Sequence, residues 1–489
     1  MENHLKRQLG LLGLAATGIC SMIGASIYVV PFMIQRNVPG IGPYVIPAFL
    51  FAAIPALLAA FAYAILSTAM PRAGGSYLYA SRSLHPYLGF IASFSQWFGL
   101  SIVIGVIAYV VIPFFRDVAW ALAWTSVAGF LEIGIVRVSL ALFLIWFFTL
   151  INIRGLKFYE RTLIPLMLLM FALGAVVIFS GLSFEHQDFL QALSKKENRS
   201  ISLIDADFSW GTFLTAAALL FSSFIGFDSI AQAGGEAKNP SKNLPKAIAL
   251  AILGVGIFYI AFTYAVYHTV PWQFVAEEAL QKDISAAGIL SYVLNPTVGI
   301  LILAGAAIAL LNDLPAMILS VSRLVFSWAE DGIFPNKLSL IHSQYQTPYA
   351  ALILSGIMAS IGVLGSHFAG DFFLGIDIMV TSMLINFLLM SCSLFFLPFR
   401  NPTLAGEIKT IKNRNVQRIL AILGMLFLAT FLIIHISKDL NAQVSDWYFH
   451  STWVYLLVLL IASLLFSYQW TQLKKSGVDV AKRFSELPD

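Results

Sequence analysis

Charged residues are scarce in this chain of 489 residues. Only 11% of them are charged, whereas 59% are hydrophobic, and an ordinary soluble domain carries about 25% charged residues. With a mean hydropathy of +0.84, the sequence has too few charges to cover the surface of a water-soluble globule of this length. The low polar content also excludes a disordered chain. What remains is a protein that crosses a membrane many times.

Several kinds of site are excluded by what the sequence lacks. The two cysteines, Cys20 and Cys392, both lie inside apolar runs, so we expect no disulfide-linked partner subunit. The eight histidines are dispersed without an H-x-x-H pair, and no P-loop is present, so we predict no metal, no cofactor, no direct use of ATP and no enzymatic activity. The net charge of +4 comes without a concentrated basic face, which argues against nucleic acid as a partner.

Long apolar runs are what the sequence does contain. They show little alternation and are long enough for membrane-spanning helices, so we predict an all-α polytopic membrane protein with about 12 spans in the lipid bilayer. The expected spans cover residues 10–34, 41–69, 86–114, 138–153, 162–182, 209–234, 244–270, 298–328, 349–366, 371–398, 418–436 and 451–473.

The distribution of basic residues predicts the orientation. If the N-terminus is cytoplasmic, 21 of the 29 lysines and arginines fall on the inner side, as the positive-inside rule requires. We therefore expect an even number of spans and both termini in the cytoplasm. The eight basic residues left for the outer side are Arg36, Arg116, Arg137, Lys195, Lys196, Arg199, Lys282 and Lys438.

One outer segment, residues 183–208, is rich in charged residues of both signs. It separates the fifth and sixth expected spans and contains no long apolar run. We expect it to be a plain solvated loop.

A weak internal repeat is the most informative feature of the sequence. Residues 21–26 read SMIGAS and residues 223–228 read SFIGFD, so both fit S-x-I-G-x-(S/D) at an offset of 202 residues. Each copy lies in the middle of an apolar run that opens a five-span unit. Glycine and small polar residues loosen a helix at mid-membrane, and interruptions at equivalent places in two halves point to a transporter binding site.

The chemistry of such breaks favours an amino acid as the substrate. An unwound helix frees backbone groups that must line a polar cavity. The half-helix beginning near Gly24 presents N–H groups and a positive dipole end to a carboxylate. The half-helices ending near Ile23 and Ile225 present carbonyls to an ammonium group. The alternative is that Gly24 and Gly226 only permit close helix packing.

Several motifs occur in an order that resembles one known family, the amino acid–polyamine–organocation (APC) superfamily of permeases. The similarity covers about residues 8–400, and its strongest motif is the run EAKNPSKNLPKA at residues 236–247. The other matching segments are residues 22–28 in the first span, 71–79 (PRAGGSYLY), 224–228 (FIGFD), 322–323 and 331–335 (DGIFP).

This resemblance implies a LeuT-type fold that works by alternating access. Spans 1–5 (residues 9–182) and 6–10 (residues 209–400) would form an inverted repeat, with spans 1 and 6 broken. This transporter core, residues 9–400, would follow a cytoplasmic tail, residues 1–8. Helices 11 and 12 (residues 401–473) and a second cytoplasmic tail (residues 474–489) would complete the chain.

The resemblance also implies which residues bind the substrate. Backbone N–H groups near Gly24 would hold the carboxylate, backbone carbonyls of both breaks would hold the ammonium, and two residues of the third span would contact an apolar side chain. The resulting substrate-binding residues are Met22, Ile23, Gly24, Ala25, Ser26, Ile27, Gly99, Leu100, Ser222, Ile225 and Gly226.

Gating and coupling residues are expected around the same breaks. Asp228 follows the sixth-span break, as a helix cap or a proton acceptor. Asn312-Asp313, followed by Pro315, interrupts the eighth span, and Asp313 is expected to carry a proton, receive a cationic group or bond other spans. One phenylalanine would serve as the gate, and one acid and one arginine would form ion pairs at the cytoplasmic gate. These further candidates are Phe221, Phe224, Phe227, Glu236 and Arg72.

Two departures from the family pattern limit the mechanism. Some proton-coupled members carry a lysine in the fifth span, where this chain has Met170. The acid that is common at the cytoplasmic end of the second span is replaced by Ile65. Coupling is therefore expected to be either exchange or proton symport through carboxylates.

Together these features predict a plasma-membrane secondary transporter of amino acids, most simply neutral ones, located in the inner membrane if the source is bacterial. One alternative keeps the fold but carries polyamines or another organic cation, with Asp228 or Asp313 as the counter-charge. The other alternative is an amino acid sensor that does not transport.

Overall fold

The protein is built from helices. The computed structural model describes residues 5–24, 26–369, 372–443 and 450–488. Within these ranges the β pairing consists of two isolated bridges, Leu9 with Ala237 and Ala73 with Ala233. Twelve helical segments are long and apolar enough to cross a membrane, so the predicted all-α polytopic class is confirmed.

Most spans are single helices, but two are divided. The first span consists of α1 (Leu11–Met22) and α2 (Ser26–Asn37), and the sixth of α10 (Trp210–Leu220), η2 (Phe221–Phe224) and α11 (Ser229–Gln232). The other spans are α3 (Val45–Ala69), α5 (Pro86–Ala121), α7 (Gly134–Ile153), α8 (Leu156–Leu182), α12 (Pro240–Thr269), α15 (Pro296–Glu330), α16 (Tyr349–Ala369), α17 (Phe372–Arg400), α19 (Arg414–Asn441) and α20 (Ser451–Lys475).

Short helices connect the spans. They are η1 (Gly42–Tyr44), α4 (Gly75–Ser83), α6 (Thr125–Glu132), α9 (His186–Glu197), η3 (Gly234–Glu236), α13 (Trp272–Gln281), α14 (Ala286–Leu290), η4 (Asn336–Ser339), α18 (Pro402–Gly406) and α21 (Val480–Arg483).

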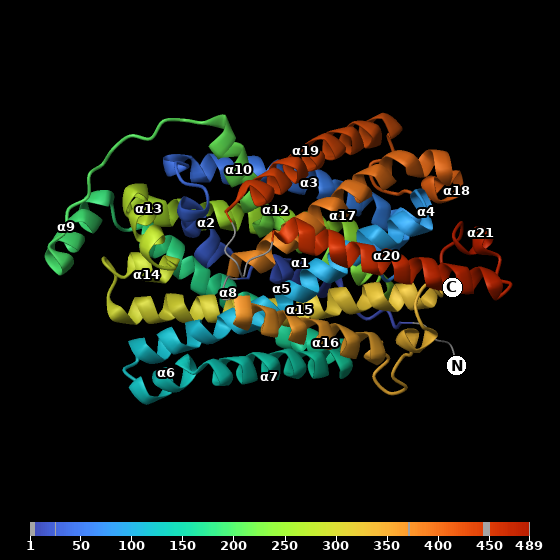
Figure 1. Cartoon of the computed structure of the whole chain (residues 1–489), viewed down its shortest axis with the longest axis horizontal. Helices are drawn as coiled ribbons and strands as arrows, with labels where there is room; N and C mark the ends of the chain where they lie inside the picture. The colour runs from blue at the N-terminus through green and yellow to red at the C-terminus, as the bar shows by residue number, and fades with distance from the viewer. Residues whose placement is uncertain (1–4, 25, 370–371, 444–449, 489) are drawn as a thin grey trace.

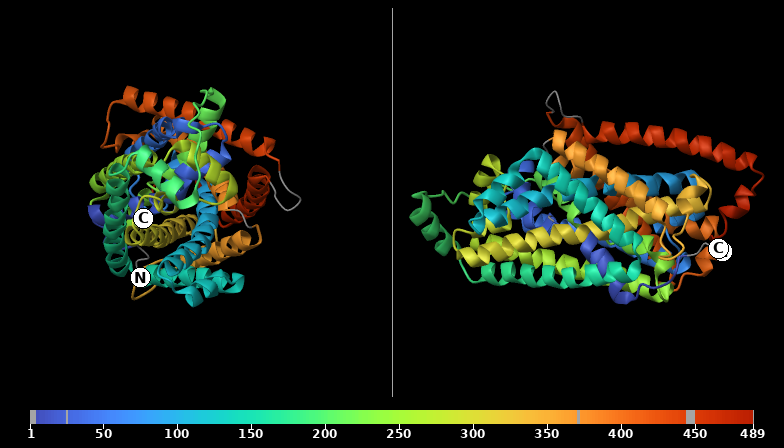
Figure 2. Two further views of the ribbon diagram at one scale, coloured as in Figure 1. Left: turned by 90° about the vertical axis from the view of Figure 1, so that its left-hand side faces the viewer. Right: turned by 90° about the horizontal axis from the view of Figure 1, so that it is seen from below.

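The long helices run roughly along the longest axis of the molecule (Figure 1, Figure 2). α6, α9, α13 and α14 lie at one end, which we call the α9 end. α18, α21 and both ends of the chain lie at the opposite end (Figure 1), which we call the termini end. A chain that starts and finishes at the same end has crossed the molecule an even number of times, in agreement with 12 spans.

The fourth and fifth spans begin earlier than the sequence predicts, at Gly134 and Leu156. The added turns contain Arg137 and Lys157. These basic residues interrupt an apolar run in the sequence, but they are compatible with a helix. Long basic side chains extend from a helix end toward polar surroundings while their methylene groups stay in apolar ones.

The expected plain loop at residues 183–208 is wrong in its first half, where α9 forms. Glu185 and Asp188 make a capping box at its start, in which each side chain accepts a hydrogen bond from the other's backbone N–H. Phe189 and Leu193, one turn apart, are buried. Capping boxes stabilise the first turn of a helix, so this E-x-x-D pattern was a local signal for α9.

Three long helices form the centre of the molecule. α5 packs along α15 and α17, and also against α16. α1 packs against α12, α15 and α8, and α10 packs against α3 and α19. This arrangement surrounds both divided spans with protein and keeps their irregular backbone away from lipid, as a bilayer requires.

Candidate functional site

The first span is interrupted between α1 and α2. α1 ends at Met22, Ile23 turns out of the helix (φ −90°, ψ 83°), and α2 begins at Ser26. The Met22 carbonyl accepts a hydrogen bond from the Tyr259 hydroxyl (2.5 Å) and another from the Gly24 N–H (3.2 Å). This carbonyl, which the sequence suggested for an ammonium group, is therefore already used within the protein.

The sixth span is interrupted over a longer stretch. A 3₁₀ turn at Phe221–Phe224 is followed by Ile225 in an extended conformation and by Gly226 with φ 133°. Side chains rarely tolerate that backbone conformation, so the position favours glycine. The Gly226 N–H donates to the carboxylate of Asp228 (3.0 Å), which holds the turn before α11.

The two breaks contact each other. A Cβ added at Gly226 would collide with the backbone carbonyl of Ser21 in α1. The Ser229 hydroxyl donates to the Ser21 hydroxyl (3.0 Å). The predicted breaks in spans 1 and 6 are confirmed, and a glycine is what allows their backbones to approach.

A small cavity of about 50 Å³ lies where the breaks meet α5, α15 and α17. The broken spans and α15 supply its polar wall, and side chains of α2, α5, α15 and α17 supply its apolar wall. The lining residues are Ser21, Met22, Gly24, Val30, Val103, Val106, Ile107, Ser222, Ile225, Asp313, Met317, Ile376 and Met379.

The structure brings part of the predicted substrate set to this cavity. The predicted residues that line it are Met22, Gly24, Ser222 and Ile225. The predicted residues that are buried in the same segments without lining it are Ile23, Ile27 and Gly226. Ala25 and the side chain of Ser26 lie outside the described residues.

The two residues expected from the third span do not line the cavity. A Cβ added at Gly99 would touch Ser382 of α17 at 2.8 Å, and Leu100 is fully buried. α5 instead contributes residues one to two turns further along, Val103, Val106 and Ile107. Their spacing of three and four places them on one helix face, so the apolar wall that we expected is built by neighbouring residues.

None of the three gate phenylalanines lines the cavity. Phe221 packs against Phe387 (6.0 Å between ring centroids), and Phe227 stacks on the same ring at 5.1 Å. Phe224 packs edge-on against Phe49 at 5.3 Å. All three rings are buried in packing between helices. Ser222 and Ile225 are the residues with which this segment faces the cavity.

Asp313 is the one charged residue among those that line the cavity. It is 2% exposed, and its Oδ1 atom has no hydrogen-bond partner. Its carboxylate lies against Gly24, because a Cβ added to Gly24 would collide with it. The expected interruption of the eighth span is wrong, since α15 continues through Pro315, whose carbonyl accepts from Asn152 (3.2 Å).

Asp228, by contrast, belongs to a buried hydrogen-bond network. Its second carboxylate oxygen accepts from the Gln96 side chain, whose own oxygen accepts from Ser76 (2.5 Å) and Gln232 (3.0 Å). Ser76 is hydrogen-bonded to the Tyr63 hydroxyl at 2.6 Å. The network joins α3, α4, α5 and α11, and the Asp228 side chain does not cap α11. Satisfied buried networks rigidify a fold.

Two buried ion pairs close the termini end of the molecule. Glu236 receives two hydrogen bonds from Arg323 of α15, at 2.6 and 3.0 Å, and both side chains are fully buried. Arg82 of α4 pairs in the same bidentate way with Asp331, with one contact at 2.9 Å. Among the described residues, Arg72 makes no ion pair within 4.0 Å.

Sequence reasoning thus found one of these four charges, Glu236. Arg323 and Asp331 stand in segments that carried the family resemblance, and both are buried charges, which need a partner. Burial alone would lower the pKa of Arg82, but the neighbouring Asp331 more than offsets it and the pKa is raised.

The segment after α20 covers the Arg82–Asp331 pair. The backbone carbonyls of Arg483 and Glu486 accept hydrogen bonds from Arg82, at 3.3 and 3.1 Å. The Phe484 ring lies 5.1 Å from the Arg82 guanidinium carbon. Arg483 in turn donates to the Asp331 carbonyl (3.3 Å). Residues 480–486 therefore form a cap on this ion pair.

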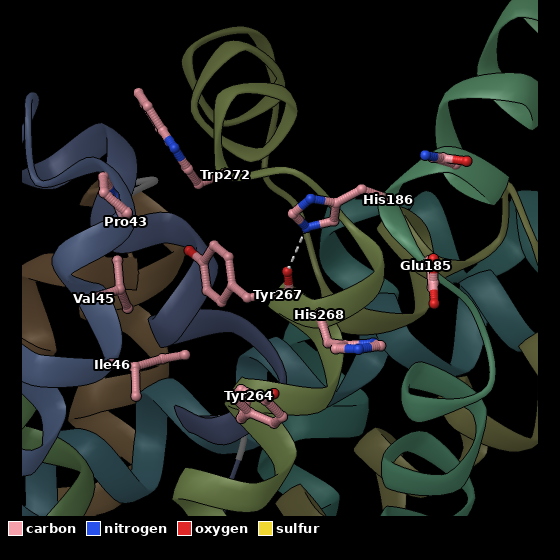
Figure 3. Close-up of a pocket in the computed structure, with 10 residues that line it drawn as sticks. Pro43, Val45, Ile46, Glu185, His186, Tyr264, Tyr267, His268 and Trp272 are labelled. Carbon is pink, nitrogen blue, oxygen red and sulfur yellow. Dashed lines mark hydrogen bonds between the residues drawn. The ribbon is translucent and has the colours of Figure 1, made fainter. Parts of the chain in front are cut away.

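Three of the larger cavities lie toward the α9 end. One, of about 520 Å³, is lined by Tyr264, His186 and Trp272 among others (Figure 3). Its His186 ring is hydrogen-bonded to the Tyr267 carbonyl at 2.9 Å (Figure 3). None of its lining residues belongs to α1, α2, η2 or α11, so we do not associate it with the breaks.

A second cavity, of about 760 Å³, lies closer to the breaks. It is lined by three arginines, Arg36, Arg116 and Arg137, and by two aspartates. It shares Val106 with the cavity at the breaks. The two cavities are therefore neighbours at this residue of α5. Within the described residues, no group of three or more His, Cys, Asp or Glu side chains is arranged to hold a metal ion.

Twelve spans around a cavity between two broken helices are typical of a membrane transporter. The family model described as amino acid permease matches residues 9–462, and the chain belongs to this family.

Curated relatives are transporters. The chain is 26% identical over 370 residues to the methylthioribose transporter of Bacillus subtilis strain 168, covering 74% of this chain and 76% of the relative. It is 27% identical over 374 residues to the branched-chain amino acid permease BcaP of the same organism, covering 75% and 76%. It is 27% identical over 373 residues to the uncharacterized transporter Rv1999c of Mycobacterium tuberculosis strain H37Rv, covering 74% of each chain.

Proposed function

We propose that this permease is a secondary active transporter of neutral amino acids that works by alternating access. The observation that carries the proposal is the cavity where Gly24, Ser222 and Ile225 of the two breaks come together. The start of α2 supplies unpaired N–H groups and a positive dipole end, which favour a carboxylate. The broken sixth span supplies backbone carbonyls, which favour an ammonium group.

The apolar wall supports a neutral, aliphatic side chain as the preferred cargo. Val103, Ile107 and Met379 face the cavity, and burying a methylene group stabilises binding by about 0.8 kcal/mol. One relative is named a branched-chain amino acid permease, which supports an aliphatic amino acid as the cargo. Another relative is named a methylthioribose transporter, so family membership alone does not identify the cargo.

A second candidate is transport of an amine without a carboxylate. Asp313 favours it, because a buried carboxylate in the cavity, one of whose oxygens has no hydrogen-bond partner, attracts an ammonium group. Against it stands the geometry of α2, whose N-terminal dipole end repels a cation.

We also propose the membrane arrangement. Residues 9–182 and 209–400 form the two inverted repeats of the core, and residues 401–473 form the appended helices. The termini end, with its excess of lysine and arginine, faces the cytoplasm, and the protein resides in the plasma membrane.

The test is uptake by purified protein in proteoliposomes. We expect leucine, isoleucine and valine to accumulate or exchange, and putrescine and spermidine not to compete. Replacing Gly24 by valine displaces Asp313 and should reduce uptake by about tenfold or more, equivalent to 1.4 kcal/mol or more. Gly365→Val is the matched control, since nothing lies within 4 Å of that glycine.

Three results would contradict the proposal. Inhibition by polyamines with no effect of free amino acids would favour the amine transporter. Binding of leucine without any flux would favour a sensor. If Gly24→Val takes up leucine at the wild-type rate, the cavity between the broken helices is not part of the transport pathway.

A further inference from the structure

Asp313 stands apart from the other buried charges of the described part of the chain. Glu236, Arg82 and Asp331 have ion-pair partners, and Asp228 accepts two hydrogen bonds. Asp313 forms no salt bridge, and its Oδ1 accepts no hydrogen bond. A buried, unpaired carboxylate is costly in a membrane protein and marks a functional position.

Among the described residues, no lysine, arginine or histidine nitrogen lies within 4.0 Å of the Asp313 carboxylate. α1 brings the Cys20 thiol, which accepts a hydrogen bond from Asn312 (2.9 Å). α5 and α17 bring Val103 and Met379, which share the cavity wall with Asp313.

Polar groups on three further helices near α15, namely α7, α8 and α2, are engaged elsewhere or lie further along. Asn152 of α7 donates to the Pro315 carbonyl. Tyr159 of α8 is hydrogen-bonded to Thr17 (2.9 Å). Tyr28 of α2 lies beside Gly305, two turns of α15 before Asp313.

The position of this carboxylate conflicts with the proposed binding mode unless it carries a proton. Asp313 lies against Gly24, directly before the start of α2, where the carboxylate of the amino acid is proposed to bind. Two negative charges in contact repel each other strongly where water is largely excluded, because the effective dielectric constant is low there. A protonated carboxyl group removes that repulsion and offers an O–H donor to the substrate.

We propose that Asp313 is the proton-binding residue that makes this permease a proton symporter. One proton from the aqueous phase binds a carboxylate oxygen of Asp313, the zwitterionic amino acid then binds beside it, and both leave on the other side. Each cycle moves one amino acid and one positive charge, and no bond other than the O–H bond is made or broken. This inference rests on the proposed transport of amino acids.

The cavity of about 760 Å³ is where we expect protons to approach Asp313. Its wall at Val106 is also the wall of the cavity that contains Asp313. Movement of the Val106 side chain is therefore expected to admit water from the larger cavity to the cavity that contains Asp313.

Proteoliposomes with a pH-sensitive dye inside test the assignment. For the wild type, external leucine should acidify the lumen, and an inwardly directed proton gradient should stimulate leucine accumulation, in sodium-free buffer. Asparagine resembles the protonated carboxyl group but cannot release a proton, so in Asp313→Asn the stimulation of leucine uptake by the proton gradient should fall about tenfold, while leucine exchange without a gradient persists at a reduced rate. Asp377→Asn, which changes another acid of a membrane span, is the control and should behave as the wild type.

Binding gives a readout that does not require transport. Leucine affinity of the detergent-purified wild type should weaken as the pH rises, because the deprotonated carboxylate opposes binding. Affinity of Asp313→Asn should not change with pH. The same measurement on Asp377→Asn should follow the wild type.

Several results would overturn the inference. If the wild type takes up leucine without acidifying the lumen, or only in the presence of sodium, the proton-coupling role of Asp313 is wrong. The proposed amino acid transport would be unaffected by that result. Loss of leucine exchange together with the gradient effect in Asp313→Asn would assign Asp313 to the substrate ammonium. If no amino acid is transported by the wild type, the proposed function and this inference fail together.

Discussion

Gly226 is the residue on which the junction of the two broken spans depends most directly. Its φ of 133° and its contact with the Ser21 carbonyl are independent reasons for the absence of a side chain. Gly24 has a different reason, since the group that would collide there is the Asp313 carboxylate. Gly226 therefore allows the two broken backbones to approach each other, and Gly24 leaves room for the Asp313 carboxylate.

Replacing Gly226 by alanine should destabilise the protein and reduce transport. Backbone strain of this kind costs about 1–3 kcal/mol, and the collision with a backbone carbonyl adds to it. The midpoint of thermal unfolding in detergent and the leucine uptake rate should both fall. Gly254→Ala is the control, because nothing lies within 4 Å of that helical glycine and alanine favours a helix. An unchanged midpoint and uptake in Gly226→Ala would show that the break tolerates a side chain.

Among the elements, the cap formed by residues 480–486 was not visible in the sequence. The segment has no apolar period, and its docking depends on backbone carbonyls that meet Arg82 of α4, about 400 residues earlier. The cap also contacts α20, because Phe484 packs against Trp470 at 5.4 Å. A segment that resembles a polar tail thus completes the environment of a buried charge.

Deleting the chain from Val480 onward should weaken the termini end. Arg82 would lose two backbone acceptors and the Phe484 ring, and hydrogen bonds to a charged group contribute about 1.5–3 kcal/mol each. We expect a lower midpoint of thermal unfolding and faster hydrogen exchange in α4. Glu486→Ala should leave both unchanged, since only the backbone carbonyl of Glu486 is used. Equal stability of the deleted and complete chains would show that the cap contributes nothing.

At the scale of the whole molecule, the spans were predictable and the lining of the cavity was only partly so. Spans follow from apolar length, and the breaks follow from Gly24 and Gly226 within apolar runs, which are local properties. The side chains of α5 that reach the cavity depend on the rotation and tilt of that helix against α15 and α17, which no local pattern fixes. Residues 103, 106 and 107 therefore replaced residues 99 and 100.

The pairing of buried charges was missed for the same reason. Arg323 and Asp331 are visible in the sequence, but their partners, Glu236 and Arg82, are far away along the chain. The phenylalanines after Leu220 were ambiguous because an unwound segment has no helical period from which to tell the cavity side from the packing side.

The proposed orientation predicts opposite accessibility of the two ends. Ser194 of α9 and Ser476 after α20 are both exposed. In a background with Cys20 and Cys392 replaced by alanine, Ser194→Cys should react with a membrane-impermeant maleimide in right-side-out vesicles. Ser476→Cys should react only after permeabilisation. The reverse pattern would invert the topology, and labelling of both from outside would exclude an even number of spans.

The cap at residues 480–486 also affects the order of biogenesis. Because it follows α20, it leaves the ribosome only after every span has been made. Arg82 therefore has no access to the backbone carbonyls of Arg483 and Glu486 until the second half of the protein has been synthesised. Until the completed chain is released, the Arg82–Asp331 pair therefore lacks this cap, and the termini end reaches its final packing last.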